Sequence, residues 1–218
     1  MDAITRSALI SFDASALADW AADFYALDRL TAGRLDAHMP GAFVHSRRVA
    51  RLAGSTARQL GLGDEEETRV RRAGAFHDIG KVEVPTEIIN KPGPLSEEEF
   101  AVVKRHPIVG ARILARWGDE RLAEIVRHHH ERFDGSGYPD GLAGEEIPVG
   151  ARIVAVADTF DAVTSARPYR PAMSRRQAFG LLRREAGAQF DPVVVGAFCR
   201  RCSGLRGFAA RRRVALPG

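Results

Sequence analysis

Apolar residues recur three and four positions apart along most of the chain, which is the period of an amphipathic helix. No run of strict alternation is long enough to predict a β-strand. The pattern therefore predicts an all-α fold. Helices are predicted over residues 14–29, 42–60, 64–79, 96–105, 107–117, 119–131, 148–165, 174–186 and 191–202.

Helix starts and loops carry their own signals. Ser96 and Ser174 are each followed three residues later by Glu or Gln, which is the capping-box pattern, and Asp191 precedes a proline as an N-cap would. Two segments, residues 81–95 and 133–147, are rich in Gly and Pro and are predicted to be loops. In compact domains, loops of this length usually carry functional residues.

A chain of 218 residues with 45% hydrophobic content is enough for one well-packed domain. We expect that domain over residues 41–200, with an N-terminal helical extension at 1–40 and an Arg-rich tail at 201–218. The net charge of +4 comes from the C-terminal end, because residues 200–218 hold six arginines and no acidic residue. The rest of the chain carries −2, which argues against a strongly basic nucleic-acid binder.

Neither a membrane span nor a secretory signal is expected. A spanning helix needs about 20 consecutive apolar residues, and the apolar runs here are far shorter. The N-terminus lacks a basic start followed by a long apolar core, so we expect a cytoplasmic location. Cys199 and Cys202 form a C-x-x-C, but no strand pattern or second ligand pair accompanies them. They are predicted to be small apolar residues on one helix face.

The candidate chemistry lies in the seven histidines, five of which are predicted to point inward. His45 lies on the same helix face as Val49, and His129 and His130 continue an apolar stripe. His128 falls on the wetter face and is predicted to be an ordinary surface residue. A single inward histidine is usually a hydrogen-bonded core residue, but five of them would each need a separate buried partner.

Two aspartates are predicted to be buried near these histidines. Asp78 follows His77 directly, and Asp158 ends the apolar run 153–157. Because an unpaired buried carboxylate is very unfavourable, a shared metal site would satisfy these groups together. Imidazoles and carboxylates without thiolate suit iron, manganese, nickel or zinc. Seven ligands exceed what one tetrahedral zinc takes, so a pair of octahedral ions bridged by a carboxylate is expected. A pair of such ions is the usual device for hydrolysing phosphate esters.

The order of these residues resembles the HD-GYP family, a branch of the HD-domain metal-dependent phosphohydrolases. The main signatures are His77-Asp78-Ile79-Gly80-Lys81, His106-Pro107, His129-His130-Glu131 and Asp134-Gly135-Ser136-Gly137-Tyr138-Pro139. Further matches are His45-Ser46-x-Arg48-Val49, Asn90-Lys91-Pro92-Gly93-x-Leu95, Ala157-Asp158-x-Phe160-Asp161-Ala162, Arg167-Pro168-Tyr169-Arg170 and Gln189-Phe190-Asp191-Pro192. A His-Asp pair alone is a weak signal, whereas this ordered set is specific.

The resemblance implies a helical bundle enclosing a binuclear metal site that hydrolyses cyclic di-GMP to pGpG, GMP or both. Two iron or manganese ions are implied, with nickel or zinc as alternatives. By position, the metal ligands of the family fall on His45, His77, Asp78, His106, His129, His130 and Asp158. Asp78 would bridge the two ions, and a bridging hydroxide would attack phosphorus.

The resemblance also implies roles around the metals. Lys81 would contact the scissile phosphate and stabilise its growing charge, although a solvated lysine beyond a helix end is the plain alternative. Arg167 and Arg170 match positions that hold phosphates or guanines, a role that the planar guanidinium fork suits. Surface ion pairs are their alternative. Gly137 and Tyr138 would lie at the rim of the substrate site, in a loop proposed for the family as a contact surface for GGDEF domains.

One departure from the family bears on the metal count. Some members place a glutamate four residues before the first histidine to hold a third metal, and here that position is Gly41, so two metals are expected. Two other functions stay open at this point: hydrolysis of a different cyclic dinucleotide or nucleotide, and a non-catalytic receptor for cyclic di-GMP. The sequence also leaves a homodimer open.

Overall fold

The structure is a computed structural model that describes residue 35 and residues 37–116, 118–166 and 171–202. Within these ranges the chain is helical, and the only β-type pairing is an isolated bridge between Ala186 and Phe190. The predicted all-α fold is therefore confirmed. The predicted helix over residues 14–29, Arg167, Arg170 and most of the Arg-rich tail lie outside the described residues.

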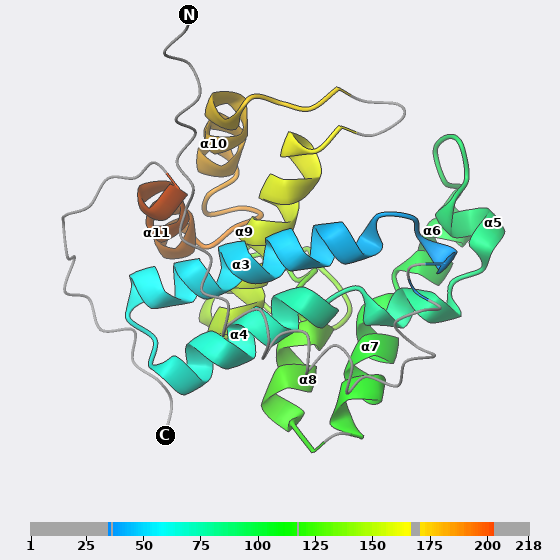
Figure 1. The fold of residues 1–218 in the computed structure, drawn as a ribbon, viewed down its shortest axis with the longest axis horizontal. Helices are drawn as coiled ribbons and strands as arrows, with labels where there is room; N and C mark the ends of the chain where they lie inside the picture. The colour runs from blue at the N-terminus through cyan, green and yellow to red at the C-terminus, as the bar shows by residue number, and fades with distance from the viewer. Residues whose placement is uncertain (1–34, 36, 117, 167–170, 203–218) are drawn as a thin grey trace, which may run out of the picture.

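Three helices form the centre of the domain. Helices α3 (Ala42–Leu60) and α4 (Asp64–Phe76) run antiparallel and are joined by a three-residue link (Figure 1). Helix α9 (Val149–Thr164) packs against both of them. Val49, Val70 and Ile153, one from each helix, are completely buried. Burying a side chain of this size contributes about 1.5–3 kcal/mol, so this three-helix contact is the main core.

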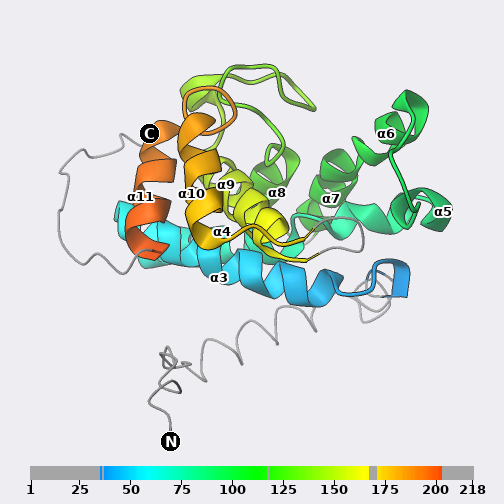
Figure 2. The ribbon, with the colours of Figure 1, turned by 90° about the horizontal axis from the view of Figure 1, so that it is seen from above.

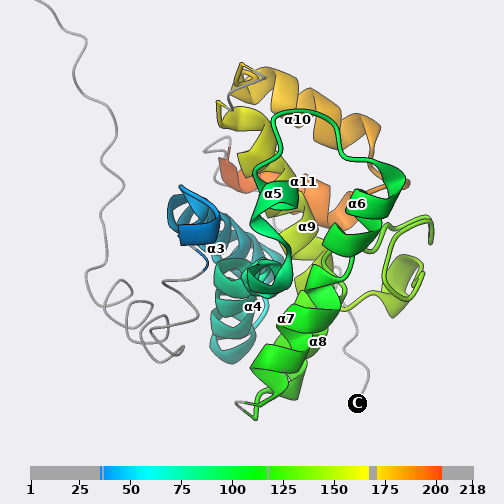
Figure 3. The same ribbon diagram turned by 90° about the vertical axis from the view of Figure 1, so that its right-hand side faces the viewer.

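The remaining helices cover two sides of this centre. Helices α7 (His106–Ala115) and α8 (Glu120–Arg127) pack side by side, with α8 against α4 (Figure 3). Helices α10 (Arg175–Arg184) and α11 (Pro192–Cys202) pack against α9, and α11 also packs against α3. Among the described residues, no helix is both long and apolar enough to cross a membrane.

Short helices occupy the two segments that were predicted as loops. The 3₁₀ helix η1 (Ile79–Glu83) and α5 (Thr86–Ile89) lie in or beside the first, and η2 (Gly144–Glu146) lies in the second. Together with α6 (Glu97–Val103), α5 projects from the end of the domain that lies away from α11 (Figures 1 and 2).

The three helix starts that the sequence signals at Ser96, Ser174 and Asp191 are confirmed. The side chains of Ser96 and Ser174 accept hydrogen bonds from backbone N–H groups three residues later, and both capping boxes are complete. The Asp191 carboxylate accepts from the backbone of Val193 at 2.7 Å. Neither cysteine forms a disulfide. Cys199 is part of the core and Cys202 packs against it, as predicted.

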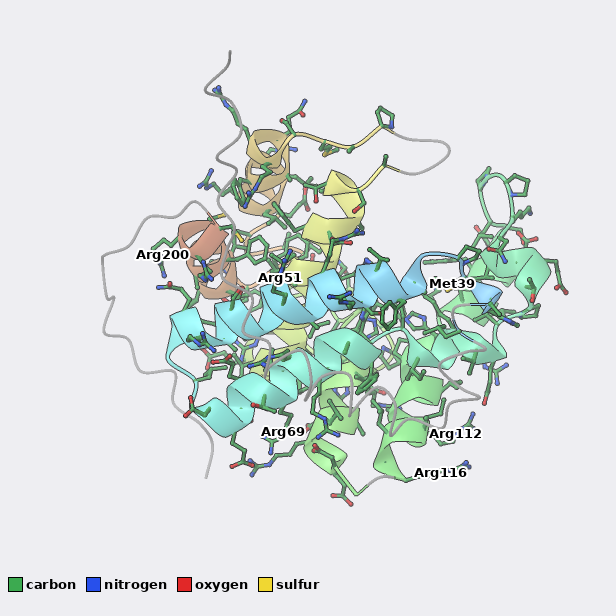
Figure 4. All side chains as sticks on the ribbon, in the orientation of Figure 1. Met39, Arg51, Arg69, Arg112, Arg116 and Arg200 are labelled. Carbon is green, nitrogen blue, oxygen red and sulfur yellow. The ribbon has the colours of Figure 1, made fainter. Side chains whose placement is uncertain are left out.

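Charged contacts fix the start of α8 against α4. Asp119 accepts a hydrogen bond from the backbone of Leu122 at 3.0 Å, which caps α8. The same carboxylate lies 3.2 Å from Arg72 and 3.6 Å from Arg69, both on α4. Figure 4 shows Arg69 near the lower end of α8, and Arg112 on the outer side of α7. The Asp119 contacts hold the start of α8 against α4, and beyond the end of α8 the ring of His129 lies against that of His77, with centroids 5.2 Å apart.

Candidate metal centre

The seven residues predicted as metal ligands come from five parts of the fold and lie together. His45 is on α3, Asp158 is on α9, and His106 is the first residue of α7. The pair His77-Asp78 follows α4, and the pair His129-His130 follows α8. Two helices are therefore shorter than predicted: α4 ends at Phe76 and α8 at Arg127, so both pairs lie just beyond a helix end.

Two groups of donors meet at Asp78. His45, His77 and Asp78 offer ligand atoms within 4.8 Å of one another, and His106, His129 and His130 form a second such group. The carboxylate of Asp78 lies 3.5 Å from Nε2 of His77 and 3.4 Å from Nε2 of His106, so it touches both groups.

Asp158 closes the first group from the α9 side. Its Oδ1 lies 3.2 Å from Nε2 of His45 and 3.8 Å from Nε2 of His77. In the second group, the Nε2 atoms of His106 and His129 are 3.4 Å apart. The Nε2 atoms of four histidines thus point at one another and at two carboxylates.

Three of these histidines are fixed by the ends of helices. Nδ1 of His77 lies 2.9 Å from the carbonyl oxygen of Gly74, and His106 and His129 make the same contact with the carbonyls of Val103 and Val126, at 2.8 and 2.6 Å. A carbonyl oxygen only accepts, so Nδ1 carries the proton in each ring. In a neutral ring this leaves the lone pair on Nε2, as metal-binding histidines require.

The electrostatics of the second group also favour metal binding. Burial lowers the pKa of His106 to about 3 and that of His130 to about 4, and it holds the pKa of His129 well below its usual value. These rings are neutral at pH 7 and able to donate a lone pair. Nε2 of His77 is buried and has no hydrogen-bond partner, which is costly unless a cation occupies its lone pair.

Both aspartates are ionised in this environment. Burial opposes ionisation, but the neighbouring basic side chains of His77 and Lys81 hold the pKa of Asp78 well below its usual range. For Asp158, burial is likewise outweighed by the hydrogen bond with His45, and the pKa falls to about 2. One buried carboxylate, Asp78, and one partly exposed carboxylate, Asp158, surrounded by imidazoles and without thiolate, fit divalent iron, manganese, nickel or zinc.

Asp161, for which the sequence predicted no role, orients His45. Its Oδ2 lies 2.7 Å from Nδ1 of His45, and its two oxygens pair with the guanidinium of Arg48. Burial lowers the pKa of His45, but the hydrogen bonds with Asp158 and Asp161 outweigh this and raise it to about 9. Asp161 lies three residues after Asp158 on α9, and this spacing on one helix face could have revealed it.

We expect Asp161→Asn to lower metal affinity and turnover by about 10–100-fold, the usual effect of losing a carboxylate behind a metal-binding histidine. The matched control is Asp191→Asn, because Asp191 is also buried and pairs with Arg152 at 2.7 Å, away from the histidines. The control should lose stability but keep its metal. Metal titration and thermal melts of both variants check this, and equal metal affinity in the two would contradict the orienting role of Asp161.

Lys81 lies beside Asp78. Its Nζ donates to Oδ2 of Asp78 at 2.7 Å from η1. Close packing of η1 on α7 fixes this segment, because a Cβ on Gly80 would lie 2.0 Å from the carbonyl oxygen of His106. Only glycine allows this approach.

The loop after the paired histidines folds back over His130. The ring of Tyr138 stacks on that of His130, with centroids 5.0 Å apart and an interplanar angle of 23°. The buried Oε1 of Glu131 accepts hydrogen bonds from the backbone N–H groups of Asp140 and Gly141 at 2.7 and 3.1 Å. The structure therefore places Tyr138 at the rim of the centre.

Gly137→Ala should destabilise the fold by about 1–3 kcal/mol, the usual cost of overpacking. A Cβ there would lie 2.2 Å from the backbone nitrogen of Arg132 and 2.5 Å from Cα of Glu131. The loop would have to move, taking Tyr138 off His130. Gly63→Ala is the control, because a Cβ at Gly63 has nothing within 4 Å. Thermal melts check the prediction, and identical melting of both variants would contradict it.

The prediction for His128 is wrong. The residue is 8% exposed and its Nε2 lies 2.9 Å from Oδ2 of Asp140, which also pairs with Arg127. The helical register that placed His128 on a wet face ends at Arg127, so the prediction extended a helix that has already stopped. Arg167 and Arg170 lie outside the described residues, so their role in binding the substrate stays a prediction from the sequence.

A model of the HD domain family matches residues 29–194, which is most of the chain, and the chain therefore belongs to this family. Among solved structures, the chain is similar to Bd1817, described as an HDG"Y"P protein, from Bdellovibrio bacteriovorus. That match has a TM-score of 0.61 and 22% identity, and it covers 75% of this chain and 53% of the other. It shows a shared fold.

Similarity to curated proteins is higher. The chain is 46% identical over 163 residues to the cyclic di-GMP phosphodiesterase response regulator RpfG of Xanthomonas campestris, a match that covers 73% of this chain and 43% of the relative. It is 40% identical over 172 residues to the 3'3'-cGAMP-specific phosphodiesterase 1 of Vibrio cholerae, covering 76% of this chain and 40% of the relative. The chain thus spans about two fifths of the length of these relatives.

Proposed function

We propose that this domain is a cyclic di-GMP phosphodiesterase that produces pGpG, GMP or both. The observation that carries the proposal is the set of imidazole Nε2 atoms that surround Asp78 and Asp158. The names of relatives such as RpfG supply the substrate. Cyclic di-GMP is a bacterial second messenger, so we propose a cytoplasmic location.

The proposed metal ligands are two carboxylates and five imidazoles, and they would hold two ions, iron or manganese before nickel or zinc. They are His45, His77, Asp78, His106, His129, His130 and Asp158. The bound ions would polarise the phosphoryl oxygens and supply hydroxide near neutral pH. Asp78 would lie between the ions because it contacts a histidine of each group.

Other side chains would handle the substrate. Lys81, which is 18% exposed, would turn its ammonium from Asp78 toward the scissile phosphate and stabilise the charge that develops there. Gly137 and Tyr138 would border the bound dinucleotide. Arg167 and Arg170, which follow the end of α9 in the sequence, would hold its phosphates or guanines. The loop that carries Gly137 and Tyr138 would offer a surface to GGDEF domains, and a homodimer is compatible with the proposal.

The test begins with anaerobic purification and metal analysis, followed by incubation with cyclic di-GMP and chromatography of the products. About two iron or manganese ions per chain, together with pGpG or GMP, would support the proposal. A metallated protein that leaves cyclic di-GMP intact would refute it.

The second candidate function is hydrolysis of 3'3'-cGAMP, favoured by the similarity to the phosphodiesterase of Vibrio cholerae. The same incubation with 3'3'-cGAMP distinguishes the two candidates by the ratio of kcat/KM. A protein that binds either dinucleotide without hydrolysing it would instead be a receptor.

A further inference from the structure

Two aromatic rings and one cation meet beside the candidate metal centre. Phe100 on α6 packs edge-on against Tyr138, with ring centroids 6.5 Å apart. Nζ of Lys104, the residue after α6, lies 5.0 Å from the centroid of Phe100 and 5.9 Å from that of Tyr138. Phe100 and Tyr138 are far apart in the sequence, so this cluster is created by the fold.

The cluster is continuous with the centre. Tyr138 stacks on His130, so three rings run outward from the proposed metal ligands to Phe100. The electrostatics of the centre also affect the phenol. Burial and the charges of Asp78 and Asp158 raise the pKa of Tyr138 above its usual value. A substrate phosphate at the centre would therefore have these rings and Lys104 beside it.

The outer members of the cluster are available to a ligand. Phe100 is 44% exposed, which is unusual for a large apolar side chain in this domain. Lys104 is exposed and forms no ion pair within the described part of the chain, although α6 begins with three glutamates. A largely exposed aromatic side chain and an ammonium that has no carboxylate partner are groups that can stack on a base and donate to its edge.

We propose that Phe100 and Lys104, with Tyr138, form a subsite for a guanine base of the substrate. Guanine presents two adjacent acceptors, O6 and N7, to a lysine, whereas adenine presents a donor, N6, beside N7. Lys104 would therefore determine specificity for guanine over adenine, and Phe100 would stack on the base. The inference rests on the proposed function for the substrate, but the chemistry of the subsite can be tested separately.

The direct test measures binding of GMP and AMP to the metal-loaded protein by calorimetry. We expect GMP to bind about tenfold more tightly than AMP in the wild type, within the range of discrimination by one good base contact. Lys104→Met should remove this preference for GMP, whereas Lys104→Arg, which keeps a cationic donor, should retain it. Phe100→Leu should weaken the binding of both GMP and AMP about tenfold, because stacking on an aromatic ring does not depend on the base. Arg105→Met, which removes an exposed neighbouring cation, is the matched control and should bind as the wild type does.

Kinetics separate this inference from the proposed function. Each variant is assayed with cyclic di-GMP and with bis(p-nitrophenyl) phosphate, a diester that has no base. Lys104→Met and Phe100→Leu should raise KM for cyclic di-GMP and leave turnover of the base-free diester unchanged.

Equal binding of GMP and AMP by the wild type, or an unchanged preference in Lys104→Met, would overturn the subsite even if cyclic di-GMP is hydrolysed. Conversely, a wild type that prefers GMP but leaves cyclic di-GMP intact would support the subsite and refute the proposed function.

Discussion

Asp78→Asn should lower phosphodiester hydrolysis more than a hundredfold and remove most of the bound metal. Losing a carboxylate that supports a metal-binding histidine already lowers metal affinity or activity by about 10–100-fold. Asp78 contacts the donor atoms themselves. Its oxygens lie 3.4 Å from His106 and 3.5 Å from His77, each in a different donor group. Asparagine preserves the shape but removes the charge, so it isolates the electrostatic role.

Metal content and kcat, measured on the same preparation, check this result. The control is Asp64→Asn, because Asp64 is an exposed acid at the start of α4, and it should retain metal and activity. An Asp78→Asn enzyme with full metal and full turnover would show that the centre does not depend on Asp78.

Lys81→Met should reduce kcat by about 10²–10³-fold, the usual cost of removing one group that stabilises transition-state charge. Metal content should fall much less, because an ammonium cannot bind a cation. Methionine keeps most of the aliphatic stem, so the packing of η1 is preserved. The expected signature is therefore a fully metallated protein that has lost its turnover.

Lys91→Met is the matched control, since Lys91 pairs with Glu99 at 2.6 Å on the surface and lies in the same connecting segment. It should behave as the wild type. If Lys81→Met loses metal and turnover to the same extent, Lys81 is a structural partner of Asp78 and has no role in transition-state stabilisation.

Residue spacing predicted the regular parts of the fold well. Helix α3 has the predicted bounds, and the capping boxes at Ser96 and Ser174 are present because they depend only on neighbouring residues. Residue spacing did not predict where α4 and α8 end at the metal centre. The rings of His77 and His129 bond to the last carbonyls of α4 and α8, and an apolar period carries no information on such contacts.

The candidate site was likewise predictable in part. The inward-pointing histidines and the two aspartates could be picked out from the apolar residues beside them in the sequence, and the structure brings those residues together. Contacts between distant segments do not follow from any local pattern. The pairing of Asp161 with His45 joins α9 to α3, and the contact of Phe100 with Tyr138 joins α6 to a loop. Both require the tertiary fold.

The hydrogen bonds from His77, His106 and His129 to helix-end carbonyls have a consequence for the dynamics of the domain. The final turns of helices are where local opening ordinarily begins, at little cost in free energy. Here the last turns of α4, α6 and α8 each hold the Nδ1 of one of these histidines. Fraying of such a turn and release of a donor atom are therefore one event, and any cation held by these rings would also hold three helix ends closed.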